Sequence, residues 1–327
     1  MTRSMDGKVC IVTGATRGIG KGIALQLGQA GATVYITGRT LTTPKDDPVG
    51  GSLTDTAKEV EDRGGKCIPV QCDHTKDSDI EKLFSQVAKE QDGRLDLLVN
   101  NAFAAVKRLS ECMGTSFWEQ PMTMWDDINN VGLRNHYLCT VHAAKLITAR
   151  RSGLIINVSS GAGLKYTFNV PFGIGKEAND RMASDCAVEL KKMNVAMVSL
   201  WPGIVRTENV LHLYKRKSED GQPVPEVIPN VDMSFLLDTG ETPEYSGKAV
   251  VALATDPNIM KKTGKIQMTP DLGYEYGFKD INGMEPLNFR QVNCLLKLST
   301  KTRWLSNFVP NFICIPKWVM AMAGNKF

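Results

Sequence analysis

The chain has 327 residues, with 39 Lys and Arg against 35 Asp and Glu, so its formal net charge is +4. Hydrophobic residues make up 42% and charged residues 23%, values that exclude a disordered or fibrous chain. So small a net charge over this length gives no reason to expect a nucleic-acid partner.

The cysteines and histidines give no sign of a disulfide framework or a metal site. Eight cysteines are scattered from Cys10 to Cys314, with no Cys-x-x-Cys pair, and only four histidines occur. This usage predicts small buried thiols in a reducing, intracellular compartment, and no metal. No run of 18 apolar residues occurs, so no membrane-spanning helix is expected.

Short apolar runs rich in β-branched residues alternate with longer segments of helical spacing. In chain order, the predicted strands are residues 9–13, 33–37, 66–71, 95–99, 154–158, 195–200 and 265–268. The predicted helices are residues 19–30, 53–63, 77–91, 118–148, 170–191 and 243–255. Strict alternation predicts the α/β class, a doubly wound parallel sheet with helices on both faces.

A glycine-rich segment follows the first predicted strand and opens the first helix. It reads Thr13-Gly14-Ala15-Thr16-Arg17-Gly18-Ile19-Gly20. Glycines there let the backbone turn tightly and approach a pyrophosphate, which then lies on the helix N-terminus. The spacing is G-x-x-x-G-x-G, and between a strand and a helix it predicts a dinucleotide site.

Two arginines favour NADP(H) over NAD(H) at this site. Arg39 follows the second strand, where an NAD-binding protein carries an acidic residue for the ribose hydroxyl, and Arg17 lies in the glycine loop. Guanidinium groups there would bind a 2′-phosphate. The alternative is two ordinary surface arginines.

Two polar residues follow the third and fourth strands. Asp73 and Asn100 stand at the carboxyl ends of parallel strands, where ligands bind, so both are predicted to line the cofactor crevice. Asn100 could instead serve as a structural hydrogen bonder at the strand end, and the two roles are compatible.

Taken in order, the motifs from about residue 5 to 275 resemble the short-chain dehydrogenase/reductase superfamily. They are TGATRGIG at 13–20, Asp73, the Asn100-Asn101-Ala102 run, Asn130, Val158-Ser159-Ser160, Lys176 and Pro202-Gly203. The resemblance implies one Rossmann-like domain of about seven parallel strands. It also implies an NADP(H)-dependent oxidoreductase that interconverts carbonyl and alcohol groups.

The resemblance also implies residue roles. Ser160 would hydrogen-bond the substrate oxygen, with Ser159 as the neighbouring candidate, and Asn130 would hold a water of the proton relay. Lys176 would bind the nicotinamide ribose and lower the pKa of the catalytic acid. Val205, through its backbone, and Thr207 would contact the cofactor.

One departure from the family pattern lies at its centre. The pattern Tyr-x-x-x-Lys reads here Phe172-Gly173-Ile174-Gly175-Lys176, so the ring is present and the acidic hydroxyl is absent. Such a general acid contributes about 10²–10⁴-fold to the rate. Tyr166, six residues upstream, is the alternative source of the proton. Phe103 stands where the superfamily commonly has Gly.

These observations leave two functions of different classes. The first is an NADP(H)-dependent reductase of hydrophobic ketones or aldehydes, such as steroid-like or xenobiotic carbonyls. The alternative is an NADP-binding pseudoenzyme that senses or scaffolds. A third interpretation is that Phe172 was introduced into an active enzyme.

The expected domain organisation is a catalytic domain at residues 1–276, with a lid insertion at about 208–240, and a C-terminal extension at 277–327. The extension contains Trp, Phe and Lys interrupted by Pro310 and Pro316. It is expected either to lie on a membrane surface or to pack over the pocket or a second copy of the chain. The expected location is the cytoplasm or the cytoplasmic face of the endoplasmic reticulum.

Overall fold

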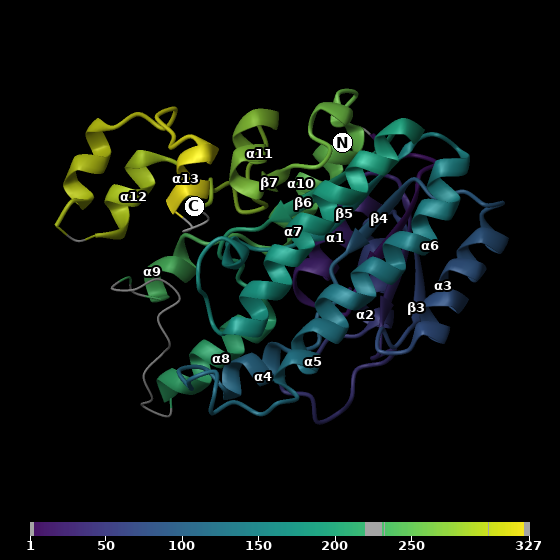
Figure 1. Cartoon of the computed structure of the whole chain (residues 1–327), viewed down its shortest axis with the longest axis horizontal. Coiled ribbons are helices and arrows are strands. Elements are labelled where there is room, and N and C mark those ends of the chain that lie inside the picture. Colours follow the sequence, from purple (N-terminus) through teal and green to yellow (C-terminus); the bar gives the residue numbers. More distant parts are fainter. Residues whose placement is uncertain (1–2, 220–230, 232, 300, 324–327) are drawn as a thin grey trace.

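The computed structural model describes residues 3–219, 231, 233–299 and 301–323. Its centre is a seven-stranded parallel sheet in the order β3-β2-β1-β4-β5-β6-β7 (Figure 1). The strands are β1 (Val9–Thr13), β2 (Thr33–Gly38), β3 (Lys66–Gln71), β4 (Leu97–Asn100), β5 (Gly153–Val158), β6 (Val195–Trp201) and β7 (Ile266–Met268). The order reverses direction between β1 and β4, and a crevice for ligands is expected at such a point.

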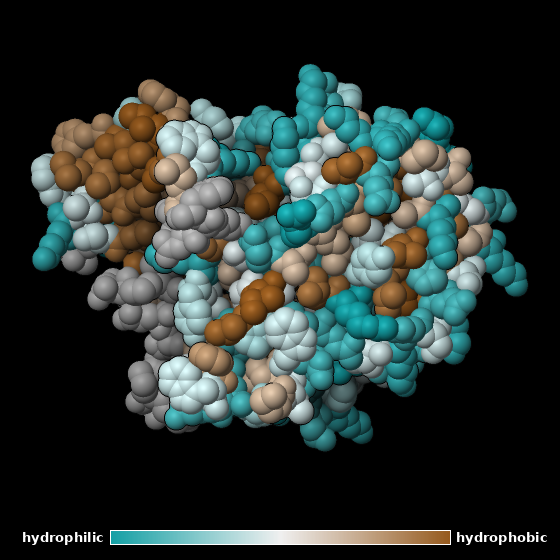
Figure 2. Space-filling model, in the orientation of Figure 1, coloured by the Kyte–Doolittle hydropathy of each residue, from teal (hydrophilic) through white to brown (hydrophobic). Residues whose placement is uncertain are grey.

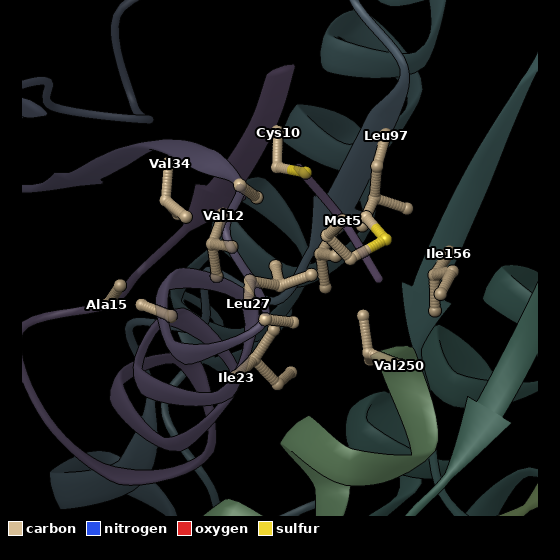
Figure 3. Close-up of a cluster of buried hydrophobic side chains, with 14 of the residues drawn as sticks. Met5, Cys10, Val12, Ala15, Ile23, Leu27, Val34, Leu97, Ile156 and Val250 are labelled. Atoms are coloured by element: carbon tan, nitrogen blue, oxygen red, sulfur yellow. The ribbon is translucent and has the colours of Figure 1, made fainter. Parts of the chain in front are cut away.

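Helices cover both faces of the sheet. One layer holds α1 (Gly18–Gln29), α2 (Leu53–Asp62) and α10 (Pro243–Thr255); the other holds α3 (Asp77–Glu90), α6 (Asn135–Ala149) and α7 (Val170–Leu190). Successive strand side chains point to opposite faces, so each strand serves both layers. In Figure 3, Val12 and Val34 of the sheet lie with Ile23 and Leu27 of α1 in one of the two cores.

The predicted doubly wound α/β sheet is confirmed, and every predicted strand lies within two residues of its observed bounds. The single helix predicted at 118–148 is wrong. The chain there forms α5 (Met124–Asn129), a π-helical turn η1 (Asn130–Arg134) and then α6.

The break in that helix has a local cause. Val131 is extended (φ −115°, ψ 94°) and Gly132 has φ 150°, a conformation open to glycine. The Gly132 amide donates to Asn135 Oδ1 at 2.7 Å, and its carbonyl accepts from Asn179 Nδ2 at 2.7 Å. Side chains therefore replace the helical bonds that the kink removes.

Three helices that the sequence pattern did not predict lie after the carboxyl ends of β4 and β6. They are α4 (Val106–Glu111) after β4, and α8 (Glu208–Glu219) and α9 (Met233–Asp238) after β6. In Figure 1, α4, α5 and α8 gather at one end of the molecule. The expected lid at 208–240 contains α8 and α9; its residues 220–230 and 232 lie outside the described part of the chain.

The C-terminal extension is folded and bonded to the core. After α11 (Thr269–Tyr276) come α12 (Val292–Leu298), the 3₁₀ turn η5 (Arg303–Phe308) and α13 (Lys317–Ala323). Asp280 accepts hydrogen bonds from the Thr242 amide and hydroxyl, at 2.7 and 2.5 Å, in front of α10. Arg290 pairs with Asp271 at 2.5 Å. None of the helices in the described ranges is both long and apolar enough to cross a membrane.

Candidate active site

The loop between β1 and α1 requires glycine for two reasons. Gly14 has φ 69°, and a Cβ there would lie 2.6 Å from the Ala102 Cα. A Cβ on Gly20 would lie 2.3 Å from the Gly14 carbonyl oxygen. Asn101 closes the loop, because its Nδ2 donates to the carbonyls of Thr13 and Gly14, both at 2.9 Å. The loop is thus held in one compact conformation against the end of β4.

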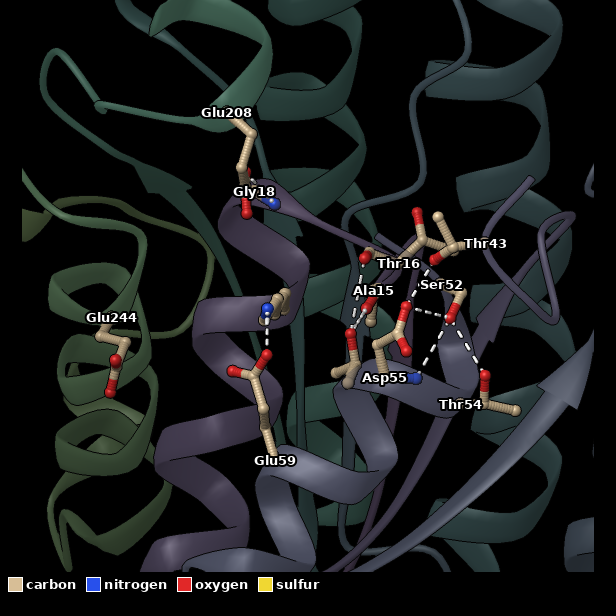
Figure 4. A network of polar contacts seen from close by, with 12 residues as sticks. Ala15, Thr16, Gly18, Thr43, Ser52, Thr54, Asp55, Glu59, Glu208 and Glu244 are labelled. Carbon is tan, nitrogen blue, oxygen red and sulfur yellow. Dashed lines mark hydrogen bonds and ion pairs between the residues drawn. The ribbon is translucent and has the colours of Figure 1, made fainter. Parts of the chain in front are cut away.

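The N-terminus of α1 donates a hydrogen bond to a carboxylate of the same chain. The Gly18 amide donates to Glu208 Oε2 at 2.8 Å (Figure 4), and Glu208 is the first residue of α8. Thr207 adjoins this contact, with its Cγ2 3.4 Å from where a Gly18 Cβ would stand, and its amide donates to the Val205 carbonyl at 2.9 Å. Ile19 anchors the helix by packing on the core. A free amide and the helix dipole explain the attraction for a carboxylate.

The two arginines differ in their partners. Arg17 Nη2 donates to Asp47 Oδ2 at 2.7 Å and to the Gly51 carbonyl at 3.4 Å, so the loop after β2 reaches back to the glycine loop. Arg39 is exposed, and its backbone carbonyl accepts from Gln71 Nε2 at 2.9 Å. Among the described residues its guanidinium has no hydrogen-bond or ion-pair partner. Arg17 already binds one anionic group, and Arg39 is accessible to another.

Asp73 lies at the same end of the sheet. It follows β3, which pairs with β2, the strand that precedes Arg39. Its Oδ1 accepts from the Thr75 amide and hydroxyl at 3.1 and 2.8 Å. Burial opposes ionisation of Asp73, but these bonds and the charges of Lys76 and Arg39 hold its pKa below the usual value. Asp73 is therefore an anionic hydrogen-bond acceptor at the carboxyl-terminal side of the sheet.

Asn100 takes the structural role that its sequence position left open. Its side chain is fully buried, and its Nδ2 donates to Asn157 Oδ1 at 2.9 Å and to Thr140 Oγ1 at 3.0 Å. Its Oδ1 is buried without a partner among the described residues. The amide ties β4 to β5 and α6 at the carboxyl end of β4.

These residues fit a nicotinamide dinucleotide. The loop backbone allows the close approach that a pyrophosphate needs, and the Gly18 amide at the helix N-terminus already donates to a carboxylate, whose place a phosphate oxygen would take. The residues that would hold the cofactor are Gly14, Arg17, Gly18, Ile19, Gly20, Arg39, Asp73, Lys176, Val205 and Thr207. Asn100 would support them from beneath.

Ser159, Ser160 and Lys176 meet where β5 ends beside α7. Ser159 is buried and donates to the Lys176 carbonyl at 3.0 Å, so it braces the helix. Ser160 is partly exposed, and its Oγ accepts from the Ala162 amide at 3.2 Å, which leaves its hydroxyl hydrogen available. Lys176 Nζ donates to the Val158 carbonyl at 3.2 Å. Ser160 is therefore better placed than Ser159 to meet a substrate.

Phe172 lies in an aromatic cluster with no acidic hydrogen. Its ring centroid is 5.7 Å from that of Phe103 and 5.3 Å from that of Phe168, both edge to face. Lys176 Nζ lies 5.6 Å from the Phe172 centroid and 5.4 Å from that of Phe103. Tyr166 does not join the cluster, because it is exposed and its hydroxyl donates to the Phe168 carbonyl at 3.3 Å.

The kinked helix carries two asparagines, and one of them packs against α7. Asn130 is partly exposed at the kink, and its carbonyl accepts the Asn135 amide. Asn129, which the sequence analysis did not select, is buried against α7: its Nδ2 donates to the Pro171 carbonyl at 3.3 Å. Its Oδ1 lies 2.2 Å from where a Gly175 Cβ would stand, which explains the glycine before Lys176.

Asp180 is the main site residue that sequence reasoning missed. It stands one helical turn after Lys176, a spacing that the sequence already contained. Its Oδ1 accepts from Ser199 Oγ at 2.5 Å and from Trp201 Nε1 at 2.9 Å. Burial raises the pKa of Asp180 to about 6 and lowers that of Lys176 to about 8. Two ionisable groups one helical turn apart on α7 thus titrate near neutral pH, and Lys176 is the one that lies against the Phe172 ring.

Comparisons with known proteins agree with this geometry. A family model described as short chain dehydrogenase matches residues 8–218. Dehydrogenase/reductase SDR family member 1 of Mus musculus is 48% identical over 327 residues, and that of Homo sapiens 47%, each covering 100% of both chains. A metagenomic short-chain oxidoreductase solved in complex with NADP aligns with TM-score 0.60 and 24% identity, over 81% of this chain and 97% of that one. The chain is a member of the short-chain dehydrogenase/reductase family of oxidoreductases.

Proposed function

We propose that the protein is an NADP(H)-dependent reductase of small hydrophobic ketones or aldehydes. One observation carries the proposal. The Gly18 amide, just after β1, donates to a carboxylate at 2.8 Å, and Ser160 and Lys176 lie at the same, carboxyl-terminal side of the sheet, where β5 ends. An anion site and a proton-handling site on one edge are what a bound dinucleotide and a carbonyl substrate require.

The proposed roles follow from the contacts. When bound, the cofactor would supply hydride chemistry at its nicotinamide. The Ser160 hydroxyl would donate to the substrate oxygen and orient it, and Asn130 would hold a water. Phe103, Phe168 and Phe172 form an apolar wall that favours a hydrophobic substrate over a charged one. Arg17 and Arg39 would bind the 2′-phosphate, for which Arg17 would exchange Asp47.

The test is consumption of NADPH by the purified chain across a panel of aldehydes, diketones and steroid-like ketones, with the dinucleotide affinity measured in parallel. The expected result is NADPH binding together with substrate-dependent oxidation. Binding without any turnover would support the second candidate, an NADP-binding sensor or scaffold. The absence of an acidic hydroxyl in the Phe172 cluster is the observation that favours that candidate.

We also propose that the C-terminal extension contacts a membrane surface on the cytoplasmic side. In Figure 2 a broad hydrophobic area covers the extension. Aromatic side chains stand largely exposed on it: Trp304, Phe308, Phe312 and Trp318. Exposed Trp and Phe beside basic residues are typical of interfacial contact. A second copy of this chain is the other occupant that such a surface would accept.

A further inference from the structure

The proposed reduction needs a proton donor that the Phe172 ring cannot provide. The Lys176 ammonium lies against that ring, with Nζ 5.6 Å from the ring centroid. Tyr166 is exposed, and its hydroxyl donates to the Phe168 carbonyl. We propose that Lys176 is itself the proton donor of this chain, and that Asp180 is the positioning residue that keeps it charged. This inference rests on the proposed reductase function.

The surroundings of Lys176 leave its protons available. Nζ donates one hydrogen bond, to the Val158 carbonyl at 3.2 Å. The rings of Phe103 and Phe172 flank the ammonium and accept no ordinary hydrogen bond. Within the described ranges the other two N–H groups meet no acceptor, and the Asp180 carboxylate acts on Nζ through its charge and not through a hydrogen bond. An ammonium so weakly bonded can release a proton toward a substrate oxygen.

Asp180 is arranged to act on Lys176 at a distance. It follows Lys176 by four residues on α7, so the two side chains share one face of the helix. Ser199 and Trp201 of β6 hold one of its oxygens. The other is buried and accepts no hydrogen bond from the described residues. Burying a carboxylate oxygen without a hydrogen bond costs free energy. The attraction between the Asp180 charge and the Lys176 ammonium offsets part of that cost.

The charged groups around the pair favour this assignment. Burial lowers the pKa of Lys176 to about 8, and the Asp180 charge opposes that shift. Glu177, on the same helix, adds negative charge near Asp180 and helps burial raise its pKa to about 6. His136 faces Lys176 from α6, but burial lowers its pKa to about 4, so it is neutral at pH 7. Between about pH 6 and 8, Asp180 is therefore ionised while Lys176 is protonated.

The proton step balances without a tyrosine. As the hydride supplied by reduced nicotinamide forms the new C–H bond, the carbonyl π electrons move to the substrate oxygen. A Lys176 N–H bond breaks, its proton forms the alcohol O–H bond, and its electron pair stays on nitrogen. The neutral amine then takes a proton from water, which restores the ammonium for the next cycle.

The experiment pairs a binding-independent readout with turnover. The pH titration of the Lys176 amine is measured in the cofactor-free chain by competitive acetylation with acetic anhydride and mass spectrometry. The pH profile of aldehyde reduction by NADPH is measured on the same chain, on Asp180→Asn and on Phe172→Tyr. Asp180→Asn keeps an oxygen for Ser199 and Trp201, so folding should be retained. Asp185→Asn, an exposed carboxylate paired with Arg181 on the same helix, is the matched control.

The expected result is slow reduction that falls above the pH at which Lys176 acetylation rises. In Asp180→Asn both transitions should move about one pH unit lower, because a charge that favours the ammonium is lost; Asp185→Asn should move neither. If the chain reduces the aldehyde but the pH midpoint of its rate differs from that of Lys176 acetylation, the inference about Lys176 is overturned and the proposed reductase function is retained. Turnover in Phe172→Tyr alone would overturn both this inference and the proposed reductase function of the unmodified chain. If neither chain turns over while both bind NADPH, the proposed reductase function itself is refuted.

Discussion

Glu208 stands where the proposed cofactor would place its pyrophosphate, so removing its charge should tighten dinucleotide binding. Its carboxylate bonds to the Gly18 amide at 2.8 Å and would be displaced, or left beside a like charge, when a phosphate arrives. Glu208→Gln keeps the size of the side chain and weakens this competition. The expected change is a lower Kd for NADPH with no change in fold.

The size of the effect follows from the contact. A hydrogen bond to a charged group contributes about 1.5–3 kcal/mol, and a neutral acceptor contributes about half of that. Glu208 is only partly buried, so solvent screening reduces the difference to about 1 kcal/mol. That free energy corresponds to a Kd about fivefold lower. Because exposed charges are screened, the gain should shrink at high salt.

The assay is a titration of NADPH fluorescence, or calorimetry, at low and high ionic strength. Glu189→Gln, which removes one exposed carboxylate on the outer surface of α7, controls for net charge and should leave the Kd unchanged. An unchanged or higher Kd in Glu208→Gln would show that the carboxylate does not compete with the cofactor. The reasoning from the Gly18 contact would then be refuted.

Three further perturbations test the cofactor choice, the missing hydroxyl and the extension, and a fourth tests a structural ion pair. Arg39→Asp should abolish a preference for NADPH over NADH of at least about tenfold, or about 1.4 kcal/mol, measured by parallel titrations; equal affinities in the unmodified chain would contradict the assignment. Phe172→Tyr should raise carbonyl reduction by about 10²–10⁴-fold, since the hydroxyl would stand near the Lys176 ammonium; equal rates would assign the proton to another group. Trp304→Ser combined with Phe308→Ser should release the protein from anionic liposomes in a flotation assay; a parent protein that never floats would exclude membrane contact. Asp96 is partly desolvated, but bonds from Arg94 and the Val9 amide and the Lys8 charge lower its pKa. Asp96→Asn should therefore cost about 1–3 kcal/mol of unfolding free energy at pH 7, and the loss should vanish as the pH falls through that lowered pKa; a pH-independent difference in denaturant melts would disprove the electrostatic origin.

Local sequence pattern was sufficient for the sheet and for the glycine loop. Short apolar runs predict strands and apolar residues at helical spacing predict helices. Both patterns are local, so they can be recognised without knowing which distant residues they contact. The same holds for Gly14 and Gly20, because a loop that joins a strand to a helix so tightly leaves no room for a Cβ. The sequence also sufficed to locate Lys176 and to show that the residue four positions earlier, Phe172, has no hydroxyl.

Long-range contacts decided what the pattern did not show. The helix expected over 118–148 breaks at Gly132, because Asn179 of α7 satisfies the freed carbonyl. Arg17 pairs with Asp47 only because the loop after β2 folds back onto the glycine loop. Likewise, Asp180 is held and buried by hydrogen bonds from Ser199 and Trp201, which lie on β6, the strand that follows α7 in the chain. Charge, burial and pKa depend on which segments meet in space, and sequence spacing along one element does not contain that information.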